Sequence, residues 1–209
     1  MPFDLWLTFV AATIALLLIP GATVMIILSY ALSKGRSVAV ATAAGVAFGD
    51  LVAMTASLAG LGALVLASST AFLVLKWMGA LYLIYLGIKL IRSAPSEGLN
   101  IPQADDITPA RVFGHTATVT ALNPKSIAFF IAFVPQFIQP DAALLPQFSV
   151  LIATFVTLAG INALAYALAA DRLRRIIKQP TVLTWITRAG GGALVTMGIL
   201  TATLRRSTA

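Results

Sequence analysis

The sequence predicts an all-α integral membrane protein, and this prediction depends on composition and on the length of the apolar stretches. Of the 209 residues, 59% are hydrophobic and only 10% are charged, and the mean hydropathy is +0.96. Soluble domains carry about 25% charged residues, so a soluble fold of this size could not cover its surface. The alternating segments of about ten residues that form membrane β-barrels do not occur. Lipid is therefore expected to be the solvent for much of the chain.

Six stretches are long and apolar enough for a helix that crosses the hydrocarbon core, which needs about 20 residues. They cover residues 5–28, 38–61, 71–91, 112–133, 148–169 and 182–204. No Lys or Arg precedes the first stretch, and it continues past the usual length of a signal-peptide apolar region. We therefore expect it to be retained as a membrane helix.

The basic residues indicate how the chain is oriented rather than a nucleic-acid partner. The net charge is +7, but the Lys and Arg residues form short clusters between the apolar stretches, as in cytoplasmic loops of membrane proteins. The main clusters are Lys34 with Arg36, and Arg172, Arg174 and Arg175 with Lys178. This asymmetry places both termini outside, although Arg205 and Arg206 at the C-terminus run against it. With no cysteine and one histidine, we expect no disulfide, no metal site and no cofactor.

The two halves of the chain resemble each other. A polar segment at about 93–109 divides the sequence near its middle. At one constant offset, Gly79 matches Gly190, Leu83 matches Leu194 and Gly87 matches Gly198. Since three helices per half is an odd number, the halves must enter the membrane from opposite sides, as in many secondary transporters. We predict one transmembrane domain, 1–209, made of two inverted three-helix repeats at about 1–92 and 110–209.

Each half also contains a break inside its first apolar stretch. Pro20 and Gly21 interrupt the first stretch, and Asn123 and Pro124 interrupt the fourth, about 16 Å beyond its start and thus near mid-bilayer. Proline removes a backbone donor, so the freed carbonyl groups need partners from protein, water or ligand. A simple packing kink is the alternative. Corresponding interruptions in both halves nevertheless indicate a binding site.

Two charges fall near the middle of predicted spans. Asp50 lies about 18 Å along the second stretch, and Lys125 directly follows the break in the fourth. Buried charges of this kind are costly and are functional candidates by default, although an Asp50–Lys125 ion pair could serve packing alone. Asp50 could bind an ammonium group or a proton, and Lys125 a carboxylate. Asn162, one turn from Tyr166, could join this site or form interhelical hydrogen bonds.

Three further features have simpler explanations. Gly45 and Gly49 are four residues apart, which permits close contact between helices, and packing is the favoured interpretation. His115, near the start of the fourth stretch, is expected to be solvated at the membrane interface rather than to relay protons. Trp77 and Trp185 are expected to pack or to lie in an interfacial belt.

Taken together and in order, several segments resemble the lysine exporter/threonine-homoserine efflux (LysE/RhtB) family over nearly the whole chain. They are IPGATVM at 19–25, GVAFGDLV at 45–52, LKWMGALYLIYLGIKLIRS at 75–93, LNPKS at 122–126, FVPQF at 133–137 and GGGALVTMGI at 190–199. The resemblance implies a non-enzymatic exporter of amino acids or their derivatives in the bacterial inner membrane, driven by protons. Members often carry Pro-Gly-Pro in the first segment, where this chain has Ala22. Basic, branched and hydroxylated amino acids are all handled within the group.

Other classes of membrane protein stay open. An intramembrane aspartyl protease would need Gly-x-Gly-Asp, but Ala47 occupies the first glycine position before Asp50, and no second aspartate lies within a span. A passive channel and a structural membrane subunit are the remaining alternatives, with a homo-oligomer compatible with any of them. The preferred hypothesis is alternating access around a midplane site between the two breaks, with Asp50 as proton or ammonium partner.

Overall fold

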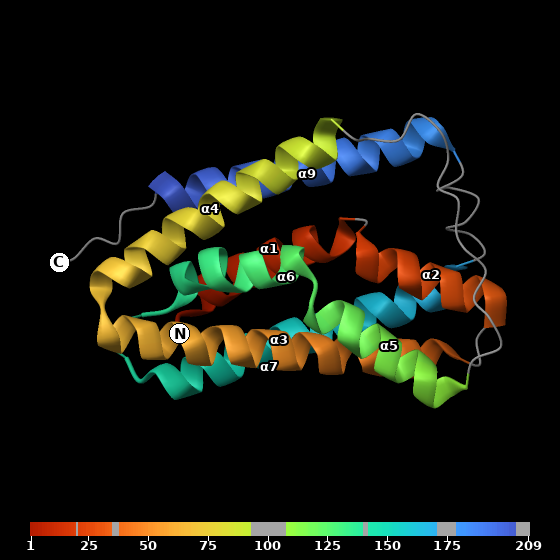
Figure 1. Ribbon diagram of the computed structural model, residues 1–209, viewed down its shortest axis with the longest axis horizontal. Helices are drawn as coiled ribbons and strands as arrows, with labels where there is room; N and C mark the ends of the chain where they lie inside the picture. The colour runs from red at the N-terminus through yellow and green to blue at the C-terminus, as the bar shows by residue number, and fades with distance from the viewer. Residues whose placement is uncertain (20, 35–37, 93–107, 140–141, 171–178, 204–209) are drawn as a thin grey trace.

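The computed structural model describes residues 1–19, 21–34, 38–92, 108–139, 142–170 and 179–203, and these residues form helices and no strand. The helices are α1 Phe3–Leu18, α2 Ala22–Lys34, α3 Ala39–Ala67, α4 Ser69–Arg92, α5 Pro109–Ala121, α6 Pro124–Ala128, α7 Leu144–Leu168 and α9 Pro180–Thr203 (Figure 1). A π-helical turn, η2 (Phe129–Phe133), and a 3₁₀ turn, η3 (Val134–Phe137), follow α6. The predicted all-helical class is confirmed for this part of the chain.

The helices are arranged around two interrupted elements, which are α1 with α2 and α5 with α6. Helices α4 and α9 lie side by side along their length and form one layer of the molecule (Figure 1). Helix α3 packs against both α5 and α7 in the opposite layer. Helices α1 and α6 lie between these layers, so the ends of the interrupted elements meet inside the molecule (Figure 1).

Among the residues that the structure describes, three helices are long and apolar enough to cross a membrane, and there are five candidates if each bent helix pair counts as one span. The three straight spans are Ala39–Ala63, Leu73–Arg92 and Leu144–Leu168. Helix α9 coincides with the sixth predicted stretch but is not among the five, because its threonines, glycines and Arg188 lower its mean hydropathy.

The structure confirms the predicted breaks in the first and fourth apolar stretches. Within residues 5–28, α1 ends at Leu18 and α2 begins at Ala22, with a bend of 59° between them. Residues 112–133 likewise divide into α5 and α6, which are bent by 41°, before the chain enters η2. The sequence signal for this division was proline at both breaks, with glycine beside it at the first and asparagine beside it at the second.

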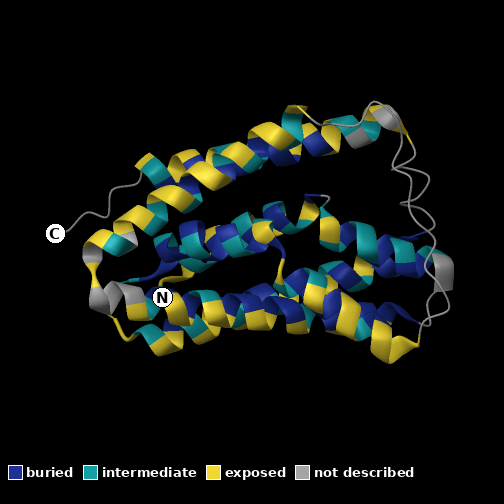
Figure 2. Cartoon of the chain, in the orientation of Figure 1, coloured by how far each residue is buried: buried dark blue, intermediate teal, exposed yellow. Residues whose placement is uncertain are grey.

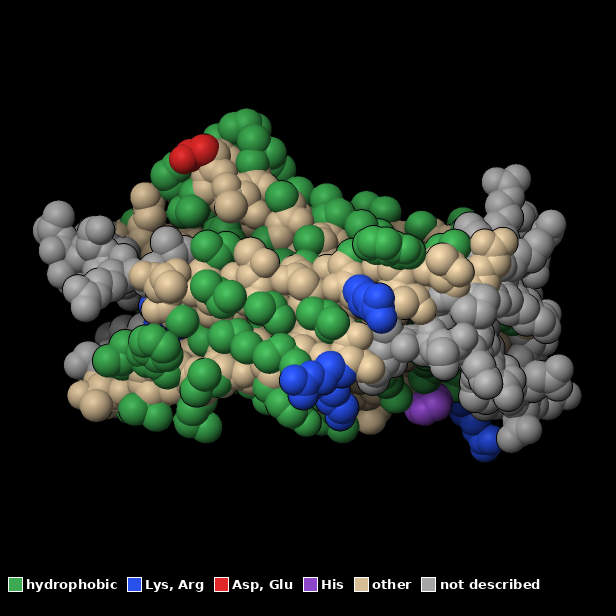
Figure 3. All heavy atoms as spheres, turned by 90° about the horizontal axis from the view of Figure 1, so that it is seen from above, with side chains coloured by type: hydrophobic (Ala, Val, Ile, Leu, Met, Phe, Trp, Pro, Cys, Tyr) green, Lys and Arg blue, Asp and Glu red, His purple; other side chains and the backbone are tan. Residues whose placement is uncertain are grey.

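The interior is built from large apolar side chains. Phe129, Phe130 and Phe155 are fully buried, and the ring of Phe155 contacts the other two. Buried positions follow the helix faces that contact one another, whereas exposed positions cover the outer faces (Figure 2). Hydrophobic side chains spread over much of the outer surface (Figure 3), and Trp77 and Trp185 are among the exposed ones. An apolar outer surface of this kind is suited to lipid.

Close contact between α3 and α5 confirms the packing interpretation of Gly45 and Gly49. A Cβ atom on Gly45 would lie 2.7 Å from the carbonyl oxygen of Phe113, and one on Gly49 would lie 2.5 Å from that of Ala117. Only a residue without a side chain lets the two helix backbones approach this closely.

Candidate functional site

The carboxyl end of α1 is the first half of the candidate site. Residue Ile19 is extended, with φ −70° and ψ 117°, so the helix cannot continue. The Leu16 oxygen accepts the backbone N–H of Ile19 (3.2 Å), and the other carbonyl groups at this end lack a following helical turn. Side chains from two other helices supply them. Lys125 Nζ donates to the oxygens of Leu16 (3.1 Å) and Ile19 (3.0 Å), Asn162 Nδ2 to that of Leu17 (3.4 Å), and the Tyr166 hydroxyl to that of Leu18 (3.4 Å).

The second break is organised by Asn123. Its side-chain oxygen accepts a hydrogen bond from the backbone N–H of Lys125 (3.0 Å), which makes it the N-cap of α6, and Pro124 occupies the first helical position. Its amide nitrogen donates to Thr23 Oγ1 at 3.0 Å. Since Thr23 lies in the first turn of α2, this single side chain links the interrupted element of one half to that of the other.

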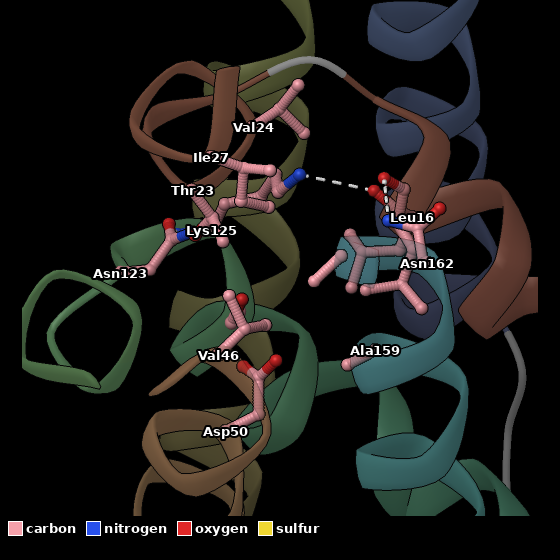
Figure 4. A pocket seen from close by; sticks show the side chains of 13 residues that line it. Leu16, Thr23, Val24, Ile27, Val46, Asp50, Asn123, Lys125, Ala159 and Asn162 are labelled. Carbon is pink, nitrogen blue, oxygen red and sulfur yellow. Dashed lines mark hydrogen bonds between the residues drawn. The ribbon is translucent and has the colours of Figure 1, made fainter. Parts of the chain in front are cut away.

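Asp50 approaches the same region from α3. Its side chain is 2% exposed, and Oδ1 is buried without a hydrogen-bond partner in the described part of the chain. The carboxylate points into the space between the two breaks (Figure 4). No salt bridge joins Asp50 to Lys125 among the described residues, and the Lys125 amino group donates to the α1 carbonyl groups.

A small cavity connects these groups. Its lining comes from α1, α2, α3, α6 and α7 and includes Leu16, Thr23, Asp50, Asn123, Lys125 and Asn162 (Figure 4). The volume open to the centre of a water-sized sphere is about 20 Å³, which is enough for about one water molecule. In this conformation the cavity is therefore closed to a larger solute.

Most of the predicted site residues are brought together here. Asp50, Asn123, Lys125 and Asn162 line the cavity, and a Cβ atom on Gly21 would lie 3.6 Å from Lys125 Nζ. Pro124 is exposed at the start of α6 and is not among the lining residues. Pro20 lies outside the described residues.

Sequence analysis missed two polar residues that shape the site and its surroundings. Thr23 is the partner of Asn123, and its only signal was a hydroxyl close to the first break. Gln147, 3% exposed, hydrogen-bonds to the backbone of Gln139, Ala142 and Ala143 and so fixes the start of α7. A buried glutamine at the edge of an apolar stretch was the available signal.

His115 lies away from the cavity. It is exposed, as expected, but its Nδ1 is 2.6 Å from the hydroxyl of the buried Tyr30. This contact joins α2 to α5. Among the described residues, no group of three His, Cys, Asp or Glu side chains could hold a metal ion.

Comparisons with known proteins identify a family for this sequence. The sequence profile of the family described as LysE type translocator matches residues 14–205. A homoserine/homoserine lactone efflux protein of Salmonella typhimurium is 33% identical over 99% of this chain and 100% of its own length. An uncharacterized membrane protein of Vibrio cholerae is 32% identical over 98% and 100%, and a leucine efflux protein of Klebsiella pneumoniae is 28% identical over 66% and 65%. No solved structure matches the chain significantly. These similarities extend over nearly the whole sequence, and the chain belongs to the LysE type translocator family.

Proposed function

We propose that this protein is a secondary active exporter of amino acids or amino-acid derivatives across the bacterial cytoplasmic membrane, coupled to protons. Family membership makes it a membrane transporter rather than an enzyme. The names of two relatives refer to efflux of homoserine, homoserine lactone and leucine, and these names support the substrate class.

The substrates named for these relatives share one chemical group. Homoserine, its lactone and leucine all carry an α-amino group, whereas the lactone has no free carboxylate. A site that serves this class therefore needs an acceptor for an ammonium group and tolerates variation elsewhere in the molecule.

The observation that carries the proposal is the convergence of both helix breaks on the buried carboxylate of Asp50, whose Oδ1 has no hydrogen-bond partner in the described part of the chain. A buried carboxylate with an unsatisfied oxygen is destabilising, so it is expected to bind a cation or a proton during the cycle. We assign the proton or the substrate ammonium group to Asp50 and the substrate carboxylate to Lys125. Asn123 and Asn162 would orient the substrate, and the breaks at Pro20–Gly21 and Pro124 would expose the backbone groups of the site.

Six spans in two inverted repeats, at about 1–92 and 110–209, form the architectural part of the proposal. Contacts between α4 and α9 support it, because they are reciprocal at the offset found in the sequence. A Cβ atom on Gly87 would meet Gly191 and Val195, and one on Gly198 would meet Ala80 and Ile84. Each of these pairs maps onto the other when the halves are exchanged, as a local two-fold axis between the helices requires.

The small size of the cavity supports the proposal of alternating access. An amino acid cannot enter a space that holds about one water molecule, so the surrounding helices must separate before substrate binds. We expect the hinges of this movement to lie at the breaks of the two interrupted elements, because hinges form at the ends of helices, where the backbone dihedral angles can change.

The test is efflux from liposomes that contain purified protein and a panel of labelled amino acids. We expect a more acidic outside to drive uphill efflux of at least one amino acid. Asp50→Asn should abolish this response to the pH gradient, whereas Asp4→Asn, at an exposed carboxylate in the first turn of α1, should retain it. Strictly downhill movement would indicate a channel, and no movement of any amino acid by folded protein would refute the exporter.

A further inference from the structure

The Lys125 side chain places an amino group among main-chain oxygens. Its Nζ lies 3.1 Å from the oxygen of Leu16 and 3.0 Å from that of Ile19. Both oxygens belong to the carboxyl end of α1, where the helix dipole concentrates partial negative charge. An amino group of any molecule with access to these oxygens would meet the same acceptors.

The surroundings of this contact form an enclosed site. The cavity beside it is lined by Asp50, which is 2% exposed and whose carboxylate points inward (Figure 4). Its Oδ1 has no hydrogen-bond partner among the described residues. Asn162 holds the neighbouring carbonyl group of Leu17, so the helix end is fixed independently of Lys125. The acceptors thus remain in place if the Lys125 side chain moves.

We propose that the carbonyl oxygens of Leu16 and Ile19 form the subsite for the substrate ammonium group, and that Lys125 fills this subsite until the substrate displaces it. This inference rests on the proposed export of amino acids, and of the two roles assigned to Asp50 above it leaves that carboxylate the proton. The displaced Lys125 amino group is then free to meet the substrate carboxylate, so one exchange of hydrogen bonds engages both ends of an amino acid.

Occupation of the ammonium subsite by the protein's own Lys125 has a consequence for the transport cycle. With Lys125 in the subsite, the helix-end carbonyl groups are satisfied, and the cavity can close without substrate. The carrier can then return after it releases its cargo. Without the lysine, the Leu16 oxygen keeps only the backbone N–H of Ile19 (3.2 Å), and the Ile19 oxygen loses its described donor. The substrate ammonium group can replace the lysine in the loaded steps, so the return step should be impaired while loaded steps continue.

The first experiment uses the wild-type protein in liposomes with labelled homoserine and leucine, each beside its N-acetyl derivative. Acetylation removes the positive charge and keeps the carboxylate. We expect acetylation to reduce efflux about tenfold or more, as the loss of charged hydrogen bonds implies. Equal efflux of acetylated and parent compounds would overturn the subsite. If the wild type moves no amino acid in the panel, the proposed function itself fails, which is a different result.

The second experiment compares net efflux with exchange at saturating substrate on both sides. In Lys125→Met we expect net efflux to fall about tenfold more than exchange, because substrate fills the subsite on both legs of the exchange cycle. Lys125→Arg, which keeps a cationic donor, should reduce net efflux less. An equal loss of both modes in folded Lys125→Met would contradict the proposal. Should this variant fail to fold, the comparison of acetylated substrates decides.

Discussion

At the residue scale, the central polar side chains each hold a specific part of the two breaks. Lys125 and Asp50, which the sequence left open as an ion pair, have different surroundings in the structure. The lysine donates to the end of α1, while the carboxylate faces the cavity. The physical reason is that a helix end inside the protein presents several unpaired acceptors at short range, and these must be satisfied.

Asn123 is expected to be the most important neutral side chain for stability at this scale. Asn123→Ala removes the N-cap of α6 and the hydrogen bond to Thr23. We expect a loss of about 1–2 kcal/mol in the free energy of unfolding, by analogy with N-cap and buried hydrogen-bond deletions. Thermal or denaturant unfolding in detergent, followed by circular dichroism, measures this loss.

The matched control is Thr118→Ala on α5, where an exposed hydroxyl bonds only to its own helix at Gly114. It should leave the unfolding transition nearly unchanged. If both variants have equal stability, Asn123 does not link the two breaks as its hydrogen bonds indicate.

At the element scale, glycines determine how closely helices approach. Gly49→Ala should destabilise the protein by about 1–3 kcal/mol through overpacking, because the new Cβ atom would lie 2.5 Å from the backbone oxygen of Ala117. Gly60→Ala in the same helix is the control, since nothing lies within 4 Å of its Cβ position. A melting temperature in detergent for each variant checks this expectation, and a Gly49→Ala protein as stable as Gly60→Ala would contradict the close α3–α5 contact.

The α4–α9 pair gives a second expectation at this scale. Gly87→Ala and Gly198→Ala occupy reciprocal positions and should lower the melting temperature by similar amounts. Gly192→Ala, which has no neighbour within 4 Å, should have little effect. A large effect at only one of the two reciprocal positions would argue against a two-fold relation between the halves.

At the scale of the whole molecule, the closed cavity requires movement of the interrupted elements against the rest. The ideal Cβ position of Gly190 on α9 is 3.3 Å from Cβ of Ile19, close to the separation found in disulfides, about 3.5–4.5 Å. Because the chain has no cysteine, Ile19→Cys with Gly190→Cys introduces a single cysteine pair.

Oxidation of this double variant should lock the end of α1 to α9 and stop efflux, and reduction should restore it. The liposome assay measures both states, and each single variant treated with the same oxidant provides the control. Full transport by the verified disulfide form would show that this junction does not move during the cycle.

The sequence alone determined the solvent of the protein, its helical class and the positions of both breaks. Those properties depend on the amino-acid composition, on the length of the apolar stretches and on the backbone hydrogen bond that proline cannot make. All three can be seen in short segments of the chain. It also located Asp50, Asn123, Lys125 and Asn162, because polar residues within apolar stretches are few and costly.

Only the tertiary structure decided which of these groups meet. The pairing of Lys125 with carbonyl groups more than 100 residues away, and of Asn123 with Thr23, depends on how the two interrupted elements pack. No local pattern encodes the choice between Asp50 and a helix end as the partner of a lysine. That choice depends on how far from the lysine the folded helices place each acceptor. It also determines which polar groups of the site are available to a substrate.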